Sequence, residues 1–427
     1  MPHAAPIDAA ADSSNHALTT GSARFKSLLI LGALSAFGPL SIDLYLPALP
    51  SLQSHFHAAA DSVQLTLTAC LVGLAAGQAL AGPLSDSLGR RKPLLIGVAA
   101  YALASLLCAF APSVGALTAG RLIQGFAGAA GIVIARAVVR DLYSGTAMVR
   151  FFSALMLVNG LAPVLAPIVG GQLLKVTVWQ GLFGVLAAIG GVLLAAVFFG
   201  LPESLPASAR RAASLGDTLR TFRRLAADRR FVGYALAAGL SFAAMFAYIS
   251  GSPFVVEQVY RLSPQEFSFM FGANALGLIL LGQLNGRLVG RVRTIVLLRA
   301  GLIQCAAGGT ALLVVTLLGL GFWPTAVCLW FVVASIGLVT PNATALALAD
   351  HGGNAGTASA FLGVTQFLIG GVVAPLTGPH GASLMAETLP MALVVAMMGV
   401  AALGAHAVLG GRREGEVRAA DTVHQAA

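Results

Sequence analysis

Charged residues are scarce in this chain: only 10% of its 427 residues are Asp, Glu, Lys or Arg, whereas 57% are hydrophobic. A soluble domain carries about 25% charged residues, and the mean hydropathy here is +0.86. So few charges cannot cover the surface of a globular protein of this length. The composition therefore excludes a soluble domain and predicts an all-α membrane protein whose surroundings are the lipid bilayer.

Cysteine is also sparse, and the four cysteines lie in apolar runs without a C-x-x-C pair. No histidines show H-x-x-H spacing, so we expect neither a metal site nor a disulfide framework. The chain has no G-x-x-x-x-G-K-[ST] motif, which argues against ATP-driven transport. We therefore expect neither an enzyme nor a bound cofactor. Transport by such a chain must draw on an ion gradient or on the substrate's own gradient.

A net charge of +9 raises the question of a nucleic-acid partner. The cations, however, are distributed over loops between apolar segments instead of forming one basic face. We therefore expect no nucleic-acid binding. Nearly all of the loop cations fall on alternate loops, with only Lys175 and Arg261 on the other side. The positive-inside rule assigns the cation-rich side, and both termini, to the cytoplasm, which predicts a multi-pass protein of the cell inner membrane.

Long apolar runs fill most of the chain. A bilayer-spanning helix needs about 20 apolar residues, and twelve such runs are present. The predicted spans are 27–50, 63–85, 93–111, 115–139, 148–174, 179–201, 231–256, 265–288, 295–318, 322–348, 355–378 and 388–410. The predicted domains are a disordered tail (1–23), a six-helix bundle (24–202), a cytoplasmic linker (203–230), a second six-helix bundle (231–410) and a tail (411–427).

The two predicted bundles repeat each other. Gly82-x-Leu84-Ser85 recurs as Gly282-x-Leu284-Asn285, and Ala166-Pro167 recurs as Ala374-Pro375. The repeated residues are separated by 200 and 208 positions, which indicates a duplicated six-helix unit. Two such halves side by side, with a binding site between them near the middle of the membrane, form a transporter architecture.

Two ionisable residues lie deep in predicted spans, where each is a functional candidate by default. With a rise of 1.5 Å per residue, Asp43 lies roughly 24 Å from the cytoplasmic start of the first span. Arg121 in the fourth span lies at a similar height, roughly 21 Å. We predict that the two interact and that Asp43 takes up and releases protons as a cleft opens and closes. A static salt bridge is the alternative.

The polar loop Gly82–Lys92 contains one acid and three adjacent cations. Asp86 lies at the level of Arg136 and Arg140, so it can pair with either. It can also cap the eleventh span, whose first residues offer free N–H groups. The second possibility predicts a latch between the two halves.

The fifth span carries a stripe at i, i+4 spacing: Leu155, Asn159, Pro163 and Pro167. Its prolines loosen the backbone hydrogen bonding, which suits a helix that bends. Packing is the alternative role for Asn159. In the second half no charged residue lies deep in a span. Phe246 is among the aromatic residues of the seventh span that can line an apolar pocket, and contact with lipid or packing in the core is the alternative role for most of them.

Three of these segments resemble signatures of the major facilitator superfamily: Gly82–Lys92 in loop 2–3, Arg121–Gly131 in helix 4 and Asn159–Gly171 in helix 5. Further segments resemble the bicyclomycin/chloramphenicol-resistance (Bcr/CflA) group of drug:proton antiporters. They are Asp43–Pro50, Arg136–Leu142, Asn274-Ala-Leu-Gly-Leu and Gln283-Leu-Asn285-Gly-Arg287-Leu.

The resemblance implies twelve helices in two pseudo-symmetric bundles and export of small hydrophobic drugs against inward protons. It implies Asp43 and Arg121 as proton-coupling residues. Together with the helix 5 stripe, it predicts substrate contacts at Asp43, Tyr45, Leu155, Asn159, Pro163 and Phe246. It predicts gating roles for Gly82, Asp86, Gly89, Arg90, Arg136, Arg140, Pro167, Gly170 and Gly171. We expect a monomer.

The functional prediction is proton-coupled efflux of small, largely neutral amphipathic compounds such as chloramphenicol- or bicyclomycin-type antibiotics. The alternative within transport is an exporter or symporter of a small metabolite, such as a sugar or amino-acid derivative. A related exporter can carry a second acid deeper in the first span, but the corresponding turn, Gly32–Ala36, offers only Ser35. This departure argues against efficient export of dications.

Overall fold

The computed structural model describes residues 21–143, 145–210, 215–349, 351, 355–378 and 384–410. The predicted tails, 1–23 and 411–427, lie almost wholly outside these residues. Apart from one isolated bridge between Val289 and Val292, the regular structure of the described residues is helical. Helices therefore satisfy the backbone hydrogen bonds internally, as a chain in a bilayer requires.

Twelve spans are formed by the long helices. The first bundle contains α2 (Gly21–Ser35), α3 (Phe37–Asp43), η1 (Leu46–Ala48), α4 (Leu49–Phe56), α5 (Ala60–Leu88), α6 (Arg91–Ala109), α7 (Val114–Leu142), α8 (Gly145–Leu173) and α9 (Trp179–Gly200). The second contains α11 (Arg229–Pro253), η3 (Phe254–Val259), α12 (Pro264–Leu288), α13 (Thr294–Leu317), α14 (Phe322–Leu348), α15 (Ala355–Val373), η5 (Ala374–Thr377), α16 (Leu384–Ala405) and η6 (His406–Gly410).

The length and hydropathy of these helices fit a membrane protein. Within the described residues, ten helices are long and apolar enough to cross a bilayer, and a helix pair bent by 45° forms a further span from Lys26 to Phe56. The 29-residue α8 supplies the twelfth. The predicted all-α fold of twelve transmembrane helices is therefore confirmed.

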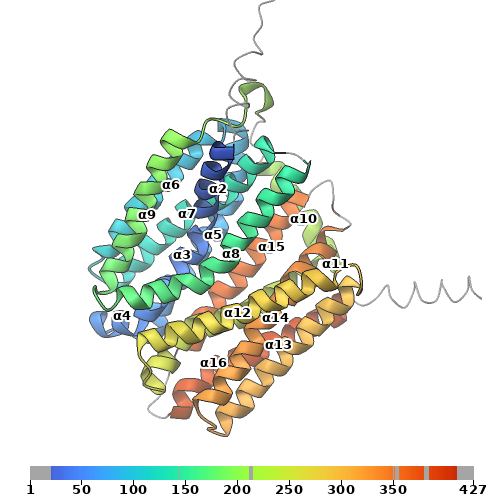
Figure 1. The fold of residues 1–427 in the computed structure, drawn as a ribbon. Coiled ribbons are helices and arrows are strands. Elements are labelled where there is room, and N and C mark those ends of the chain that lie inside the picture. The colour runs from blue at the N-terminus through green and yellow to red at the C-terminus, as the bar shows by residue number, and fades with distance from the viewer. Residues whose placement is uncertain are drawn as a thin grey trace, which may run out of the picture.

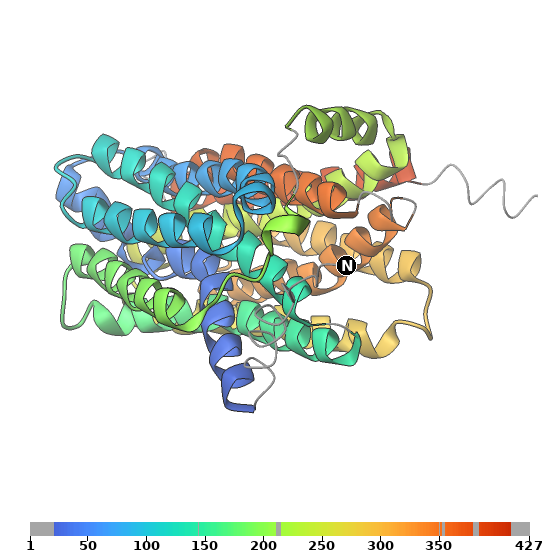
Figure 2. The ribbon, with the colours of Figure 1, turned by 90° about the horizontal axis from the view of Figure 1, so that it is seen from above.

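The helices form two groups that lie side by side (Figure 1). The blue-to-green helices α2–α9 make up one group, and the yellow-to-red helices α11–α16 make up the other. The groups meet where α5 packs against α15 and where α8 packs against α12. In the view turned by 90°, most of the long helices run side by side in a similar direction, whereas the dark-blue α2 is inclined steeply to them (Figure 2).

Loops alternate between the two ends of the bundles. We call one of them the basic end, because Arg90, Arg140 and Arg287 lie there at the ends of α5, α7 and α12. The other, the opposite end, carries the α4–α5 and η3–α12 connections.

Two prolines explain why the first span is broken on either side of Asp43. A proline ring clashes with the carbonyl four residues earlier and interrupts the helix. Pro39 lies four residues after Ser35, the last residue of α2, and Pro47 lies four residues after Asp43, the last residue of α3. The sequence thus places the acid at the last residue of a short helix, next to a change in backbone direction.

The segment between the bundles contains a helix that the sequence analysis did not predict, α10 (Leu215–Ala227). Its Leu225 is buried, and Phe222 packs edge-on against Phe361 of α15, with ring centroids 5.3 Å apart. α10 lies beside α11 and α15, outside the spans (Figures 1 and 2). The helix α10 therefore packs against the second bundle.

Candidate functional site

A cavity of about 600 Å³ lies between the two bundles. Its walls come from the first span, α5, α7 and α8 on one side and from α11, α12, α14 and α15 on the other. The polar lining residues are Ser35, Asp43, Gln78, Arg136, Tyr248, Thr340, Thr344, Ser359 and Gln366. The remaining wall is apolar and includes Phe242, Phe246, Phe271 and Phe367. Such a chamber can hold a compound of drug size that is mostly apolar.

Hydrogen bonds join the two bundles at the opposite end. Gln64 of α5 donates to the backbone oxygen of Ser250 (3.0 Å) and to Thr377 Oγ1 (3.2 Å). Thr68 donates to the backbone oxygen of Gly371 at 2.7 Å. The side chains of Gln64, Ser250 and Thr377 are fully buried. The cavity is therefore closed at this end.

Close backbone packing at α8 reinforces this closure. A Cβ atom at Gly170 would collide with the backbone oxygen of Leu44 in the first span. A Cβ atom at Gly171 would collide with Ser268 Oγ of α12, and would lie 3.1 Å from the backbone oxygen of Pro264. Gly170 thus packs within the first bundle, whereas Gly171 packs across the interface.

Two further contacts belong to the closed end. Gln265 of α12 donates to the Gly171 backbone oxygen at 2.7 Å, and Gln258 of η3 donates to Gln53 of α4 at 2.8 Å. Pro167, one turn before Gly170, is buried.

The cavity extends toward the basic end. Two of its lining residues there, Arg136 of α7 and Ser359 of α15, are exposed. Arg136 lies near the C-terminal end of α7 and Ser359 near the N-terminal end of α15. The contacts of Gln64 and Thr377 between the bundles lie at the opposite end. The protein is therefore in a conformation that opens at the basic end.

Asp43 lines this cavity with only 5% of its surface exposed. No cation lies within 4 Å of its carboxylate in the described part of the chain. Arg136 is the other charged residue among the lining residues. Asp43 is thus an unpaired acid in a largely apolar chamber, facing the space between the bundles.

Arg121 does not interact with Asp43, contrary to the predicted pairing. The guanidinium lies inside the first bundle, fully buried, 4.4 Å from the centroid of the Tyr45 ring and 5.7 Å from that of Phe183. It donates to Gln124 Oε1 of its own helix. The predicted heights say nothing about the direction around the helix axis, and α7 turns Arg121 away from the cavity.

A hydrogen-bonded chain surrounds this buried cation. Gln124 donates to Ser105 Oγ at 2.7 Å, and Ser105 donates to the backbone oxygen of Tyr101 at 2.8 Å. The Tyr101 hydroxyl lies 2.8 Å from Ser41 Oγ, two residues before Asp43. Arg121 therefore contacts the first span through aromatic rings and hydroxyls. Cation–π contacts of this desolvated kind contribute about 2 kcal/mol.

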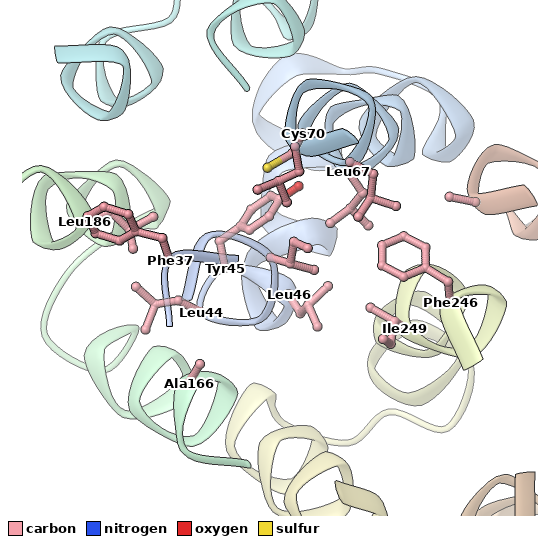
Figure 3. Close-up of a cluster of buried hydrophobic side chains, with 14 of the residues drawn as sticks. Phe37, Leu44, Tyr45, Leu46, Leu67, Cys70, Ala166, Leu186, Phe246 and Ile249 are labelled. Carbon is pink, nitrogen blue, oxygen red and sulfur yellow. The ribbon is translucent and has the colours of Figure 1, made fainter. Parts of the chain in front are cut away.

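The predicted substrate contacts divide into two groups. Asp43, Pro163 and Phe246 line the cavity. Tyr45 and Leu155 do not: both belong to the buried core, and the Tyr45 hydroxyl pairs with Thr66 at 2.9 Å. Figure 3 shows Tyr45 beside Cys70 in this core, with Phe246 and Ile249 of α11 nearby. Asn159 is on α8, but its side chain is outside the described part of the structure.

The loop between α5 and α6 is held by a cluster of charges at the basic end. Arg90 contacts Asp86 at 2.5 Å and Asp141 at 2.8 Å. Burial acts to lower the pKa of Arg90, but its hydrogen bonds to Asp141 and Asp86 outweigh this effect and raise the pKa. The predicted partners of Asp86 were Arg136, Arg140 or the start of the eleventh span. Arg90, one helical turn away, takes one carboxylate oxygen of Asp86, and no ion pair joins Asp86 to Arg136 or Arg140 among the described residues. The predicted cap stays a prediction, because the residues just before the eleventh span lie outside the described part of the chain.

The other predicted gating residues have varied surroundings. Arg136 lines the cavity mouth, Arg140 is exposed, and a Cβ atom at Gly82 would meet only Val133, at 3.9 Å. Gly89 has a φ of 89°, a conformation that favours glycine. A Cβ atom there would also lie 2.5 Å from Glu203 Oε2. Only glycine fits this turn.

Glu203 is a residue that the sequence analysis missed. It accepts hydrogen bonds from the backbone N–H groups of Arg90 (2.8 Å) and Arg91 (3.2 Å) at the start of α6. An acid at a helix N-terminus satisfies free N–H groups and interacts favourably with the helix dipole. Because Glu203 follows the sixth span by sequence, nothing local links it to α6.

The chain matches the family model described as Major Facilitator Superfamily over residues 29–375. The chain belongs to the major facilitator superfamily. It is 40% identical over 397 residues to the uncharacterized MFS-type transporter YdgK of Bacillus subtilis (strain 168), covering 92% of this chain and 97% of that protein. It is 35% identical over 352 residues to the bicyclomycin resistance protein homolog of Haemophilus influenzae (82% and 88% covered).

A multidrug transporter, MdfA of Shigella boydii serotype 4, is 30% identical over 356 residues (81% and 84% covered). These relatives place the chain in the Bcr/CflA group of this superfamily, as the resemblance implied. It is a transporter and not an enzyme.

Solved structures share the fold. The partially occluded, inward-open xylose transporter XylE of E. coli superposes with a TM-score of 0.70 at 15% identity, covering 90% of this chain and 97% of that chain. A bacterial homologue of the lysosomal transporter Spinster, in an inward-facing and unoccupied conformation, gives 0.69 at 17% identity (91% and 96% covered). At such identities the likeness concerns the major facilitator fold alone.

Proposed function

We propose that this protein exports small, largely neutral amphipathic drugs, such as chloramphenicol- or bicyclomycin-type antibiotics, in exchange for protons. The observation that supports the proposal most directly is the unpaired carboxylate of Asp43, the one acid among the described residues that line the largely apolar cavity between the bundles. The relatives named for bicyclomycin resistance and multidrug transport support the choice of cargo.

The orientation follows from the cations. The basic end faces the cytoplasm by the positive-inside rule, so both termini are cytoplasmic and the protein resides in the cell inner membrane. The cavity then opens to the cytoplasm in this structure. A drug enters it from the cytoplasm or the inner leaflet and meets Asp43 near the closed end.

Asp43 acts as the site where drug and proton compete. An ionised carboxylate alone in a closed, apolar chamber costs about 3 kcal/mol or more, so the bundles close over Asp43 only when it is neutralised. When the protein carries a proton inward, that proton neutralises the carboxylate of Asp43. When the protein carries a drug outward, the bound drug compensates the charge of Asp43 through a donated hydrogen bond and through the exclusion of water. Closure without either is disfavoured, which couples the two fluxes.

Arg121 belongs to the same bundle as Asp43 but does not line the cavity. Its guanidinium is buried inside the first bundle without a carboxylate within 4 Å among the described residues. Its contacts with the rings of Tyr45 and Phe183 hold α7 against the first span and α9. Arg121 therefore contributes to the coupling by positioning the span that carries Asp43, without exchanging protons itself.

The proposal is tested in proteoliposomes loaded with chloramphenicol, under an imposed pH gradient. Wild-type protein should move the drug against its concentration gradient, and Asp43→Asn should retain only downhill movement. Glu266→Gln is the matched control, because Glu266 is an exposed acid at the start of α12 whose capping role glutamine also serves. Gradient-driven transport by Asp43→Asn at the wild-type rate would contradict the proposal.

A further inference from the structure

The second bundle contributes a fixed hydroxyl to the cavity. Tyr248 of α11 lines the same chamber as Asp43, with only 1% of its surface exposed. Asn274 of α12 donates a hydrogen bond from Nδ2 to the Tyr248 hydroxyl at 3.0 Å. The Tyr248 ring stacks on that of Phe271, with centroids 5.4 Å apart and planes inclined by 20°. Two neighbours on α12 therefore hold the phenol in one position.

The hydrogen-bond inventory of a phenol determines what this hydroxyl can do. The oxygen of Tyr248 accepts from Asn274, so its own proton remains to be donated to another acceptor. Tyr248, on α11, and Asp43, on the first span, both line the cavity. A phenol of one bundle and a carboxylate of the other thus border the same chamber.

We propose that Tyr248 is the hydrogen-bond donor of the second bundle in the drug site, and that Asn274 positions it. This inference rests on the proposed export function and specifies its substrate class. A fitting compound carries an acceptor, such as a carbonyl, nitro or hydroxyl oxygen, for Tyr248. It carries a donor, such as an amide N–H, a hydroxyl or a protonated amine, for Asp43. Its remaining surface is apolar or aromatic.

The walls around these two groups fit the apolar part of such a compound. Phe242 stacks on Phe246, with centroids 5.8 Å apart, and packs edge-on against Phe367 of α15 at 5.7 Å. Phe271 lies on the other side, beneath Tyr248. All four rings belong to the second bundle, so an aromatic part of the compound would pack against that bundle, while Asp43 contacts the compound from the first bundle.

The charges of the cavity set a limit on the same class. Asp43 is the one acid and Arg136, at the mouth, is the one base among the described lining residues. A neutral or singly charged compound satisfies Asp43 completely. A dication would leave its second charge without a carboxylate in this chamber, and would also approach past Arg136.

Binding to purified protein in lipid nanodiscs tests the role of Tyr248. Chloramphenicol offers both acceptors and donors, whereas tetraphenylphosphonium offers neither. Tyr248→Phe keeps the ring and removes the hydroxyl, so we expect chloramphenicol to bind about ten-fold more weakly and tetraphenylphosphonium to bind as before. Tyr260→Phe is the control, because its hydroxyl pairs with Thr325 (3.1 Å) outside the cavity.

The positioning role of Asn274 is tested with a double-mutant cycle. Asn274→Leu should weaken chloramphenicol binding, but the double variant should bind no more weakly than Tyr248→Phe alone. Additive losses would overturn the positioning role. Tyr248→Phe binding chloramphenicol within two-fold of wild type, or losing both probes equally, would overturn the donor role.

The two proposals fail in different ways. If wild-type protein binds chloramphenicol with the expected dependence on Tyr248 but shows no gradient-driven efflux, the export function is wrong and the subsite stands. If wild-type protein shows gradient-driven efflux and Tyr248→Phe binds chloramphenicol as tightly as wild type, the subsite is wrong and the export function stands. Failure of wild-type protein to bind chloramphenicol would overturn the assigned substrate class.

Discussion

Replacing Gly171 by alanine should shift the protein toward the conformation that opens at the opposite end. In the present structure an added Cβ would collide with Ser268 Oγ and lie 3.1 Å from the Pro264 backbone oxygen, both on α12. Overpacking of this kind costs about 1–3 kcal/mol. The strain exists only while the two bundles touch there, and it disappears once that end opens.

The magnitude follows from the relation between free energy and populations. A cost of about 1–3 kcal/mol changes the ratio of the two conformations by roughly 5- to 150-fold, since about 1.4 kcal/mol corresponds to ten-fold. If the wild-type protein favours the present conformation by less than this cost, the alanine variant will mainly occupy the other. Gly170→Ala should behave differently, because its collision with Leu44 lies within the first bundle and persists in both conformations.

Distances between spin labels report the shift. One pair, at Lys92 and Arg287, spans the basic end, and another, at Val176 and Leu318, spans the opposite end; all four positions are exposed. The four native cysteines are replaced first. We expect Gly171→Ala to shorten the first distance and lengthen the second. Gly184→Ala on α9, where a Cβ atom meets nothing within 4 Å, is the control. Unchanged distances in Gly171→Ala would refute the assignment of this contact as part of the closed end.

Two further predictions concern the ends of the bundles. Gln64→Leu removes the hydrogen bonds to Ser250 and Thr377, each contributing about 1 kcal/mol, so it should lengthen the label distance at the opposite end; an unchanged distance would show that these bonds do not hold the closure. Arg90→Gln leaves two acids without their cation and should lower the thermal midpoint. Because the pKa of Arg90 is raised, the stability that its charge contributes is fully present below its unfolded pKa. It is lost only as the pH rises through the folded pKa, so the difference between wild type and variant should stay constant across the neutral range, and a difference that varies there would contradict this account.

The sequence predicted the helices well because run length alone determines a transmembrane span. The ninth and tenth predicted spans, 295–318 and 322–348, differ from α13 and α14 by at most one residue. The linker helix α10 was missed because it is short and polar, and its buried Leu225 and half-buried Phe222 find their partners only in the second bundle.

The candidate site was harder to predict than the fold. Depth in a span can be counted from the sequence, and it placed Asp43 and Arg121 at similar heights. The direction in which a side chain leaves the axis of α7 cannot be obtained by counting residues. In the structure this direction points Arg121 into the first bundle, away from Asp43. Tyr248 and Asn274 carry no charge, so their cost in a membrane is too small to single them out. Their contact joins two helices whose relative placement only the structure provides.

The central claim is that drug and proton compete for Asp43. It is tested most directly by measuring protons released when chloramphenicol is added to purified protein in weakly buffered solution. The account predicts proton release from the wild type and from Glu266→Gln, and none from Asp43→Asn. Equal release from Asp43→Asn and wild-type protein would contradict it.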